Sequence, residues 1–187
     1  MKYIGEALKI IAFAGMPFSG KSEAVNIARK LNIPVIRMGD MIWDETKNRG
    51  LELSNKNVGK IADIMRKEHG MNVWAKRTLE KIKSIKGVDL LVIDGVRNIE
   101  EIETFEKELG KNFLLIAVQV SNKERYKRAL TRGREDDSQD INLIKERDKR
   151  ELSWGLGSVI ASADIIITNE GPVEEFKQKI VELFNKI

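Results

Sequence analysis

The chain has 187 residues, of which 42% are hydrophobic and 33% are charged, and its formal net charge is +4. It contains no cysteine, which excludes disulfide bonds and thiolate metal sites and is compatible with a reducing cytoplasm. The balanced charge requires neither nucleic acid nor membrane as a partner, and no apolar run approaches the ~18 residues of a membrane-spanning helix. We therefore expect a single cytoplasmic domain over residues 1–187, present as a monomer or homodimer and unlikely to bind nucleic acid.

The first predicted elements are a strand, a glycine-containing loop and a helix. Residues 8–14 form a buried apolar strand, residues 15–22 fit the phosphate-loop pattern G-x-x-x-x-G-K-[ST], and residues 23–31 carry apolar side chains at helical spacing. Main-chain N–H groups of such a loop and helix start favour an anion. The alternative is an ordinary strand-to-helix turn. The residues predicted to bind the phosphates of ATP are Gly15, Met16, Pro17, Phe18, Ser19, Gly20, Lys21, Ser22 and Glu23.

A second strand, residues 34–38, leads into Gly39-Asp40. At the end of this strand, Asp40 faces the same crevice as the phosphate loop and could orient an acceptor, or act as a general base if the acceptor is a hydroxyl. Capping of the following helix explains the residue equally well. The interval up to residue 87 holds at least two more helices, about 58–68 and 73–85, and insertions of this kind overhang the ligand crevice of parallel sheets.

The third strand, residues 89–94, ends in Asp94-Gly95 and is followed by Arg97. An acidic residue at this position, together with the Ser22 hydroxyl, suits Mg²⁺ bound to a nucleotide. The alternative is that Asp94 caps the helix that begins near Ile99. Arg97 lies where a guanidinium can grip a phosphate with two hydrogen bonds.

The fourth strand, residues 113–120, precedes a basic helix over about 123–132. Arg128 and Arg132 share one face of this helix, and with Arg134 they could stabilise a transferring phosphoryl group. Arg147 and Arg150, on a second helix that begins near residue 141, could add to them. The alternative is a solvated basic face with local ion pairs. With a fifth strand at residues 164–168, strands alternate with helices, which predicts an α/β fold with a mostly parallel sheet.

The order of these motifs resembles the nucleoside monophosphate kinases and the dephospho-coenzyme A kinases, and more narrowly the archaeal adenylate-kinase-related proteins. The similar segments are residues 15–23, 39–41, 94–97, 134–137 and 163–171. The resemblance implies a three-layer P-loop kinase fold with a five-stranded parallel sheet, a helical acceptor-binding arm at about 40–87 and a lid at about 122–140. Two departures reshape the acceptor pocket: Trp43 stands where adenylate kinases carry an arginine, and Met38 replaces a small hydroxyl residue.

The resulting expectation is a kinase that uses ATP with Mg²⁺ and phosphorylates a small nucleotide-type acceptor, an AMP-like nucleoside monophosphate. Two alternatives remain, a kinase acting on a hydroxyl of the dephospho-coenzyme A type and a regulatory ATP-binding protein without transfer activity. Trp43, Trp74 and Trp154 are expected in the core or the crevice wall, where any of them could flank a nucleobase. The residues expected to act in catalysis are Lys21, Asp40, Arg97, Arg128, Arg132 and Arg134, and those expected to organise the metal are Ser22 and Asp94.

Overall fold

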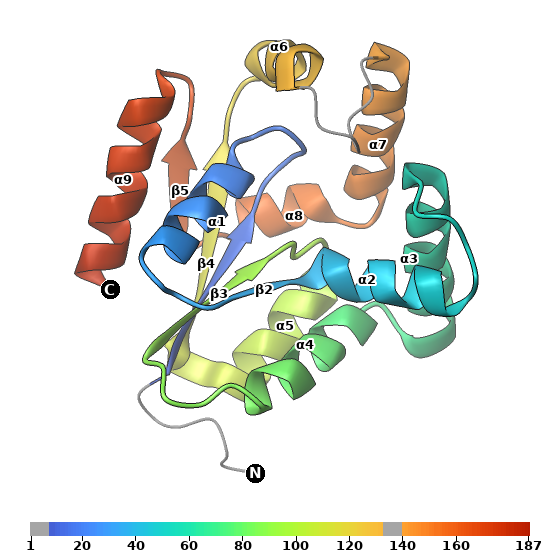
Figure 1. Cartoon of the computed structure of the whole chain (residues 1–187), viewed down its shortest axis with the longest axis horizontal. Helices are drawn as coiled ribbons and strands as arrows, with labels where there is room; N and C mark the ends of the chain where they lie inside the picture. Colours follow the sequence, from blue (N-terminus) through green and yellow to red (C-terminus); the bar gives the residue numbers. More distant parts are fainter. Residues whose placement is uncertain (1–7, 133–139) are drawn as a thin grey trace.

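A computed structural model describes residues 8–132 and 140–187, and its centre is one parallel sheet of five strands in the order β2-β3-β1-β4-β5 (Figure 1). The strands are β1 (Lys9–Ala14), β2 (Val35–Arg37), β3 (Leu90–Asp94), β4 (Phe113–Gln119) and β5 (Ile165–Thr168). Each lies within one residue of its predicted bounds, and the predicted α/β fold with a five-stranded parallel sheet is confirmed.

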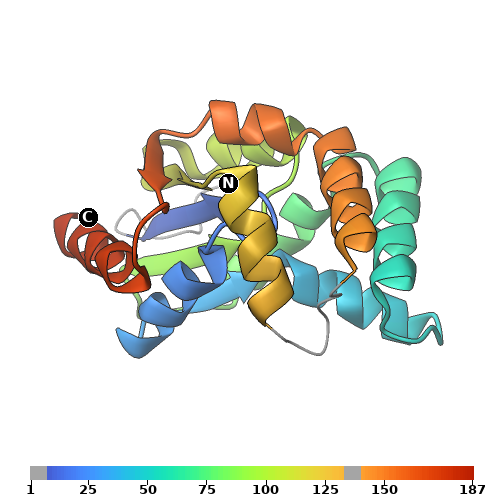
Figure 2. The ribbon, with the colours of Figure 1, turned by 90° about the horizontal axis from the view of Figure 1, so that it is seen from above.

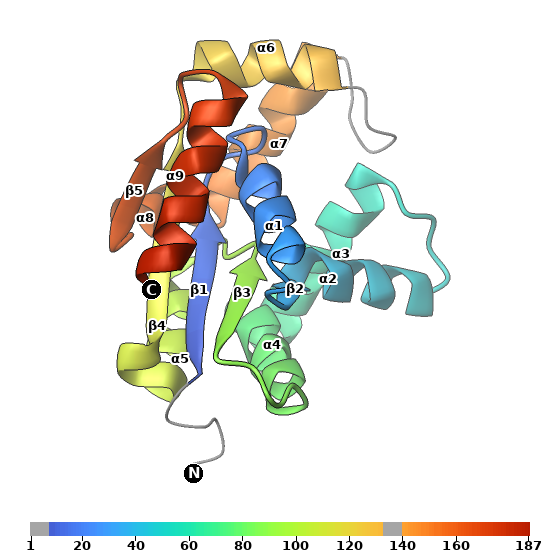
Figure 3. The ribbon, with the colours of Figure 1, turned by 60° about the vertical axis from the view of Figure 1, so that its left-hand side comes forward.

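The helices cover both faces of the sheet. They are α1 (Lys21–Lys30), α2 (Met38–Asn48), α3 (Asn55–His69), α4 (Val73–Lys83), α5 (Ile99–Leu109), α6 (Asn122–Arg132), α7 (Ile141–Ser153), α8 (Leu156–Ala161) and α9 (Val173–Lys186), with a 3-10 turn at Gly110–Asn112. Figure 3 shows α1 and α9 together on one face, and Figure 1 shows α4, α5 and α8 on the other. A sheet covered on both faces explains why the strands are continuously apolar.

Alternate residues of β1 feed two separate cores. Ile11 and Phe13 pack with Phe176 and Phe184 of α9 beneath α1, and the ring of Phe13 meets that of Phe184 edge to face at 6.3 Å. Ile10 and Ala12 point the other way, into the cluster that contains Trp74 and Phe105. Because β1 is buried on both sides, the phosphate loop that follows it starts from a rigid base.

Local chemistry sets several helix boundaries differently from the prediction. Helix α3 begins at Asn55 rather than near residue 58, because the Ser54 hydroxyl accepts the N–H of Asn57 at 3.2 Å. Helix α5 is capped by Asn98, whose side chain accepts the N–H of Glu101 at 2.8 Å. Asp94 is therefore not the cap. Helix α2 continues directly from β2 and begins at Met38, so Asp40 lies within its first turn.

The predicted site lies at the end of the sheet that is formed by the carboxyl ends of the strands. Helices α2, α3, α6 and α7 stand at this end of the sheet, and Figures 1 and 2 both show α3 beside α7. The indole N–H of Trp154, just after α7, donates to Asp63 of α3 at 2.6 Å, which agrees with this placement. Arg134, in the predicted lid, lies outside the described residues. Among the described helices, none combines the length and apolar character needed to cross a membrane.

Candidate active site

The phosphate loop has its main-chain carbonyl groups occupied by its own lysine and by side chains from distant elements. The Lys21 ammonium donates to the carbonyls of Gly15 and Met16. Arg125 of α6 donates to the carbonyl of Pro17 at 3.0 Å, and Asn169, after β5, donates to that of Ser19 at 2.8 Å. The N-cap residue of α1 is Gly20, which has no side chain to cap the helix. The loop and helix start thus retain the uncapped N–H groups that favour an anion.

Two glycines let the loop approach its neighbours closely. A Cβ at Gly15 would lie 2.5 Å from the carbonyl oxygen of Val118, and one at Gly20 would lie 2.2 Å from the Asn169 amide nitrogen. Both backbones also have a positive φ, of 146° and 108°, which side chains disfavour. Both glycines of the motif are therefore required by the packing of the loop as well as by its shape.

Phe18 occupies a left-handed conformation, with φ 63°, although a bulky residue resists it. Its ring is 9% exposed and packs against Ala129 of α6 and Ile144 of α7. This apolar contact offsets the backbone strain, which is of the order of 1–3 kcal/mol. It also joins the phosphate loop to α6, which lies within the predicted lid, and to α7, which follows the lid.

Lys21 is the loop residue whose pKa is shifted furthest from its ordinary value. Burial, followed by the positive charge of Arg97, lowers the pKa of Lys21 from 10.5 to about 7, although Asp94 and Glu151 act in the opposite direction. A polyphosphate would supply the negative charge that this buried ammonium lacks. A strongly shifted group in a crevice is typical of a functional site.

A cavity of about 730 Å³ is lined by residues of α2, α3 and α7, and its lining residues Asp94, Arg97 and Glu151 influence the pKa of Lys21 in the loop. Its lining brings together Asp94, Gly95 and Arg97 from the end of β3, and it includes all three tryptophans. The charged side chains of its wall are Arg37, Arg66, Arg97, Arg147, Arg150, Asp94, Glu101 and Glu151. Five arginines against three carboxylates leave the cavity positively charged, which suits an anionic ligand.

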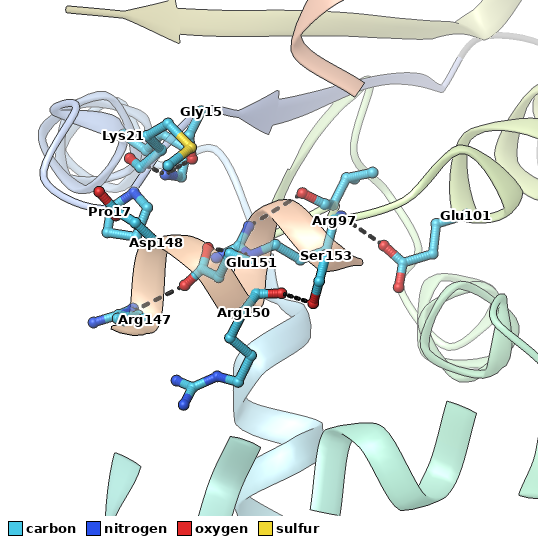
Figure 4. Close-up of polar contacts among 12 residues, drawn as sticks. Gly15, Pro17, Lys21, Arg97, Glu101, Arg147, Asp148, Arg150, Glu151 and Ser153 are labelled. Atoms are coloured by element: carbon cyan, nitrogen blue, oxygen red, sulfur yellow. Dashed lines mark hydrogen bonds and ion pairs between the residues drawn. The ribbon is translucent and has the colours of Figure 1, made fainter. Parts of the chain in front are cut away.

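Glu151 of α7 lies between two of these arginines, as Figure 4 shows. Its carboxylate pairs with Arg97 at 2.9 Å and with Arg147 at 3.0 Å. Burial alone would raise the pKa of Glu151, but Arg97, Arg147 and Lys21 outweigh it and lower the pKa to about 2. Glu151 therefore stays ionised and holds Arg97 at the edge of the cavity.

Glu101 connects Arg97 to the deeper part of the cavity. One of its oxygens accepts the main-chain N–H of Arg97 at 2.7 Å, and the other accepts from the Arg66 guanidinium at 3.3 Å. Both side chains of this pair are at most 3% exposed. Burial raises the pKa of Glu101, while Arg66 and the Arg97 N–H partly counteract that shift.

The residues predicted for magnesium, Ser22 and Asp94, carry oxygen atoms of the kind that this ion prefers as ligands. Asp94 ends β3 opposite Phe13 in the register with β1, at the carboxyl edge of the sheet, and it influences the pKa of Lys21. Ser22 lies in the first turn of α1. Within residues 8–132 and 140–187, no group of three or more acidic or histidine side chains is arranged so that it could hold a metal ion. Mg²⁺ in kinases is commonly bound by one or two protein oxygens together with phosphates.

Arg128, Asp40 and Glu23 are not among the described residues that line the cavity. Arg128 pairs with Glu124 at 3.1 Å, as the alternative interpretation anticipated, and donates to the carbonyl of Asn169 at 2.9 Å. Asp40 is 43% exposed and pairs with Arg37 at 3.4 Å. Glu23 lies 3.8 Å from Lys177 of α9. Arg132 ends α6, and Arg134 falls outside the described chain.

Sequence reasoning missed Glu151, Glu101 and Arg66, because acidic and basic residues on helices are usually solvated. Two signals could have indicated them. Arg147 and Glu151 are four residues apart, a spacing that places an ion pair on one helix face. Asn98 and Glu101 have the spacing of a helix-capping box, which predicts that the Glu101 carboxylate turns back towards the main chain at the helix start, near Arg97.

The phosphate loop and the strand order define a protein with a P-loop kinase fold, and comparisons with solved structures agree. Shikimate kinase from Acinetobacter baumannii, solved in complex with shikimate, superimposes with a TM-score of 0.58 at 18% identity, over 97% of this chain and 95% of that one. TT1252 from Thermus thermophilus gives a TM-score of 0.66, also at 18% identity, over 96% and 98% of the two chains. At such identities the likeness concerns the fold alone.

Sequence comparison places the chain more narrowly. A model of a family described as an AAA domain matches residues 14–145. A UPF0200 protein of Methanosarcina barkeri is 46% identical over 178 residues, 95% of each chain, and one of Thermococcus kodakarensis is 39% identical over 180 residues, 95% of this chain and 97% of the other. The chain belongs to the UPF0200 proteins and to the family of that model. The predicted P-loop kinase fold is confirmed by the comparison with solved structures.

Proposed function

We propose that this protein is an ATP-dependent kinase that transfers the γ-phosphoryl group to a nucleoside monophosphate. The observation that carries the proposal is the position of Arg97. It lines the cavity and is also the largest charge influence on the buried Lys21 of the phosphate loop. An acceptor phosphate bound at Arg97 would thus lie next to the outer phosphates of ATP.

The transfer itself needs charge stabilisation more than proton transfer. An oxygen of the acceptor phosphate forms a bond to the γ-phosphorus, the bond to the bridging β,γ-oxygen breaks, and ADP leaves. Lys21 and the loop N–H groups hold the β- and γ-phosphates, while Arg97 and Arg147 hold the acceptor. Mg²⁺ held by Ser22 and Asp94 would neutralise phosphate charge when it is bound with ATP.

The cavity favours a phosphate over a hydroxyl as the attacking group. A hydroxyl benefits from a general base, and Asp40 was the candidate for that role. Asp40 is not among the described residues that line the cavity, and it pairs with Arg37. A monophosphate with its second pKa near ~6 is already ionised at neutral pH and needs no base.

A screen with labelled ATP tests the proposal. The purified protein is incubated with each common nucleoside monophosphate and, separately, with dephospho-coenzyme A, and labelled products are separated. We expect a labelled diphosphate. Label on dephospho-coenzyme A alone would replace the proposal by the hydroxyl kinase, and tight ATP binding without any transfer would indicate the regulatory protein.

Lys21→Met provides the matched control. It removes the ammonium and retains an unbranched side chain in a buried position. Loss of one such preorganised charge contact lowers turnover by roughly 10²–10³-fold. Equal activity of this variant and the parent would mean that the observed transfer comes from a contaminating kinase, and the proposal would fail.

A further inference from the structure

The deep end of the cavity contains buried hydrogen-bond donors that no described residue satisfies. The Nε and Nη1 atoms of Arg66 and the indole N–H of Trp74 are buried and have no acceptor in the described parts of the chain. Arg66 is 4% exposed and Trp74 is 0% exposed, and both line the cavity. Buried polar groups in native proteins almost always have a partner. Unpaired donors that line a cavity therefore indicate a ligand that carries acceptors.

The guanidinium of Arg66 is fixed in place. Its Nη2 atom is engaged by Glu101, and its plane lies over the ring of Trp154, with 4.4 Å from Cζ to the ring centroid. Side chains held in this way cannot turn to find other partners. Both oxygens of Glu101 are already engaged, by Arg66 and by the main chain of Arg97. The remaining donors of Arg66 thus have no acceptor among the described residues.

Trp154 offers a direct comparison with Trp74 within the same cavity. The indole N–H of Trp154 donates to Asp63 at 2.6 Å, so its hydrogen-bonding capacity is satisfied by the protein and its ring serves as a flat wall. The N–H of Trp74 has no such partner among the described residues. Of these two tryptophans, only Trp74 has a donor left for a ligand.

We propose that Arg66 and Trp74 select the base of the acceptor, favouring an oxo-substituted base over one that carries an amino group at the same position. This inference rests on the proposed function and narrows the AMP-like expectation. Arg97 holds the phosphate, and Glu101 joins Arg97 to Arg66, so the base extends towards the deep donors. A carbonyl oxygen can accept from such donors, whereas an exocyclic amino group is itself a donor and leaves them unpaired.

Two pairs of monophosphates test this difference. UMP and CMP differ in an oxo or amino group on the pyrimidine, and IMP and AMP differ likewise on the purine; in each pair the adjacent ring nitrogen also changes from a donor to an acceptor. One unsatisfied buried group lowers affinity by about ten- to hundredfold. We expect at least a tenfold preference for the oxo member of the pair whose ring fits the cavity, in binding measured by calorimetry and in kcat/KM. Equal or better binding of the amino member in both pairs would overturn the inference.

Variants test whether the preference for an oxo group depends on Arg66 and Trp74. Trp74→Phe removes the N–H and retains an aromatic ring, and Arg66→Lys retains the charge beside Glu101 but removes the Nε and Nη1 donors. Each should bring the oxo-to-amino ratio close to one while ATP affinity is retained. Trp43→Phe, at the cavity wall, should change the affinity for both members equally and leave their ratio intact. An unchanged ratio in both Trp74→Phe and Arg66→Lys would refute the assignment.

Separate measurements of binding and of phosphoryl transfer distinguish a failure of this inference from a failure of the proposed function. Discrimination in binding without phosphoryl transfer would refute the kinase and support the selective donors. Transfer without discrimination would support the kinase and refute the selectivity. If no monophosphate binds, both are refuted. Thermal melting of each variant shows whether it folds, and if Trp74→Phe does not fold, Arg66→Lys decides.

Discussion

The phosphate loop and the deep end of the cavity lie close together, but they satisfy their polar groups differently. In the loop, the carbonyls of Gly15, Met16, Pro17 and Ser19 all accept hydrogen bonds from side chains of the same protein. In the cavity, Arg66 and Trp74 retain donors without partners in the described chain. These loop carbonyls are satisfied before any ligand arrives, whereas the cavity lacks acceptors that a ligand would bring.

This difference separates affinity from selectivity. A site whose dipoles are already fixed needs no reorganisation to bind its anion, so the loop can hold any suitable polyphosphate. A site with unsatisfied donors discriminates between ligands according to the atoms that they present. The following three predictions test the phosphate loop and the residues that hold it, from the largest expected effect to the smallest.

Replacing Arg125 by methionine should have the largest effect. Arg125 is 1% exposed, forms two hydrogen bonds to Asp148 and holds the Pro17 carbonyl. The variant leaves a buried carboxylate without its partner, and breaking such a pair destabilises by about 3–5 kcal/mol. Urea denaturation measures the loss, and calorimetry of the folded fraction should show weaker ATP binding.

The control for this variant is Lys127→Met on the same helix. Lys127 is exposed, so the free energy of unfolding should change by no more than about 0.5 kcal/mol. If Arg125→Met and Lys127→Met were equally stable, the buried pair would have no structural role and the loop would not depend on α6.

The affinity for ATP should depend on pH through Lys21. In the free protein the pKa of Lys21 is about 7, and bound phosphates favour its charged form. As the pH rises above about 7, free Lys21 loses its proton, so ATP binding must take one up. Affinity then falls by up to about tenfold per pH unit. Calorimetry at pH 8 in buffers of different ionisation enthalpy would detect an uptake approaching one proton.

One control variant and one stability measurement check this prediction. Lys21→Arg keeps its charge at every accessible pH and should abolish the proton uptake. Because the native pKa lies below the ordinary value of 10.5, the unfolded chain binds the extra proton, and the stability of the free protein should rise with pH above about 7. A pH-independent affinity between pH 7 and 9 would contradict the depressed pKa.

Replacing Arg128 by methionine should have the smallest effect. Its ion pair with Glu124 is partly exposed, and such pairs contribute about 0–1 kcal/mol. We expect a stability loss within that range and a change in kcat below about tenfold, with Glu124→Gln as the control that spares the bond to Asn169. A loss of kcat near 10²-fold in Arg128→Met alone would show that α6 brings Arg128 onto the phosphates.

Most of the fold could be predicted from the sequence because its strands are covered on both faces. Runs such as residues 90–93 and 113–118 are continuously apolar, so their bounds can be read directly. Helix ends were harder to predict. Single side chains such as Ser54 and Asn98 set the starts of α3 and α5, and α8 is separated from α7 by Gly155, with φ 105°.

Only those parts of the site that are formed by local sequence motifs could be predicted. Residues 15–22, Asp94 and Arg97 lie at strand ends, where topology alone brings them together. The partners that complete the site come from helices whose composition is typical of a surface, such as Arg125, Asp148 and Glu151. Their burial depends on pairing between elements far apart in the chain, which periodicity within one helix does not encode.

The bonds to the carbonyls of Pro17 and Ser19 come from residues 108 and 150 positions later in the chain. During synthesis, a ribosome therefore exposes the whole glycine motif long before the side chains that shape it exist. An N-terminal fragment that contains residues 15–22 but stops before Asn169 has the motif without its finished conformation. The finished conformation of the loop thus forms only after Asn169 has been made.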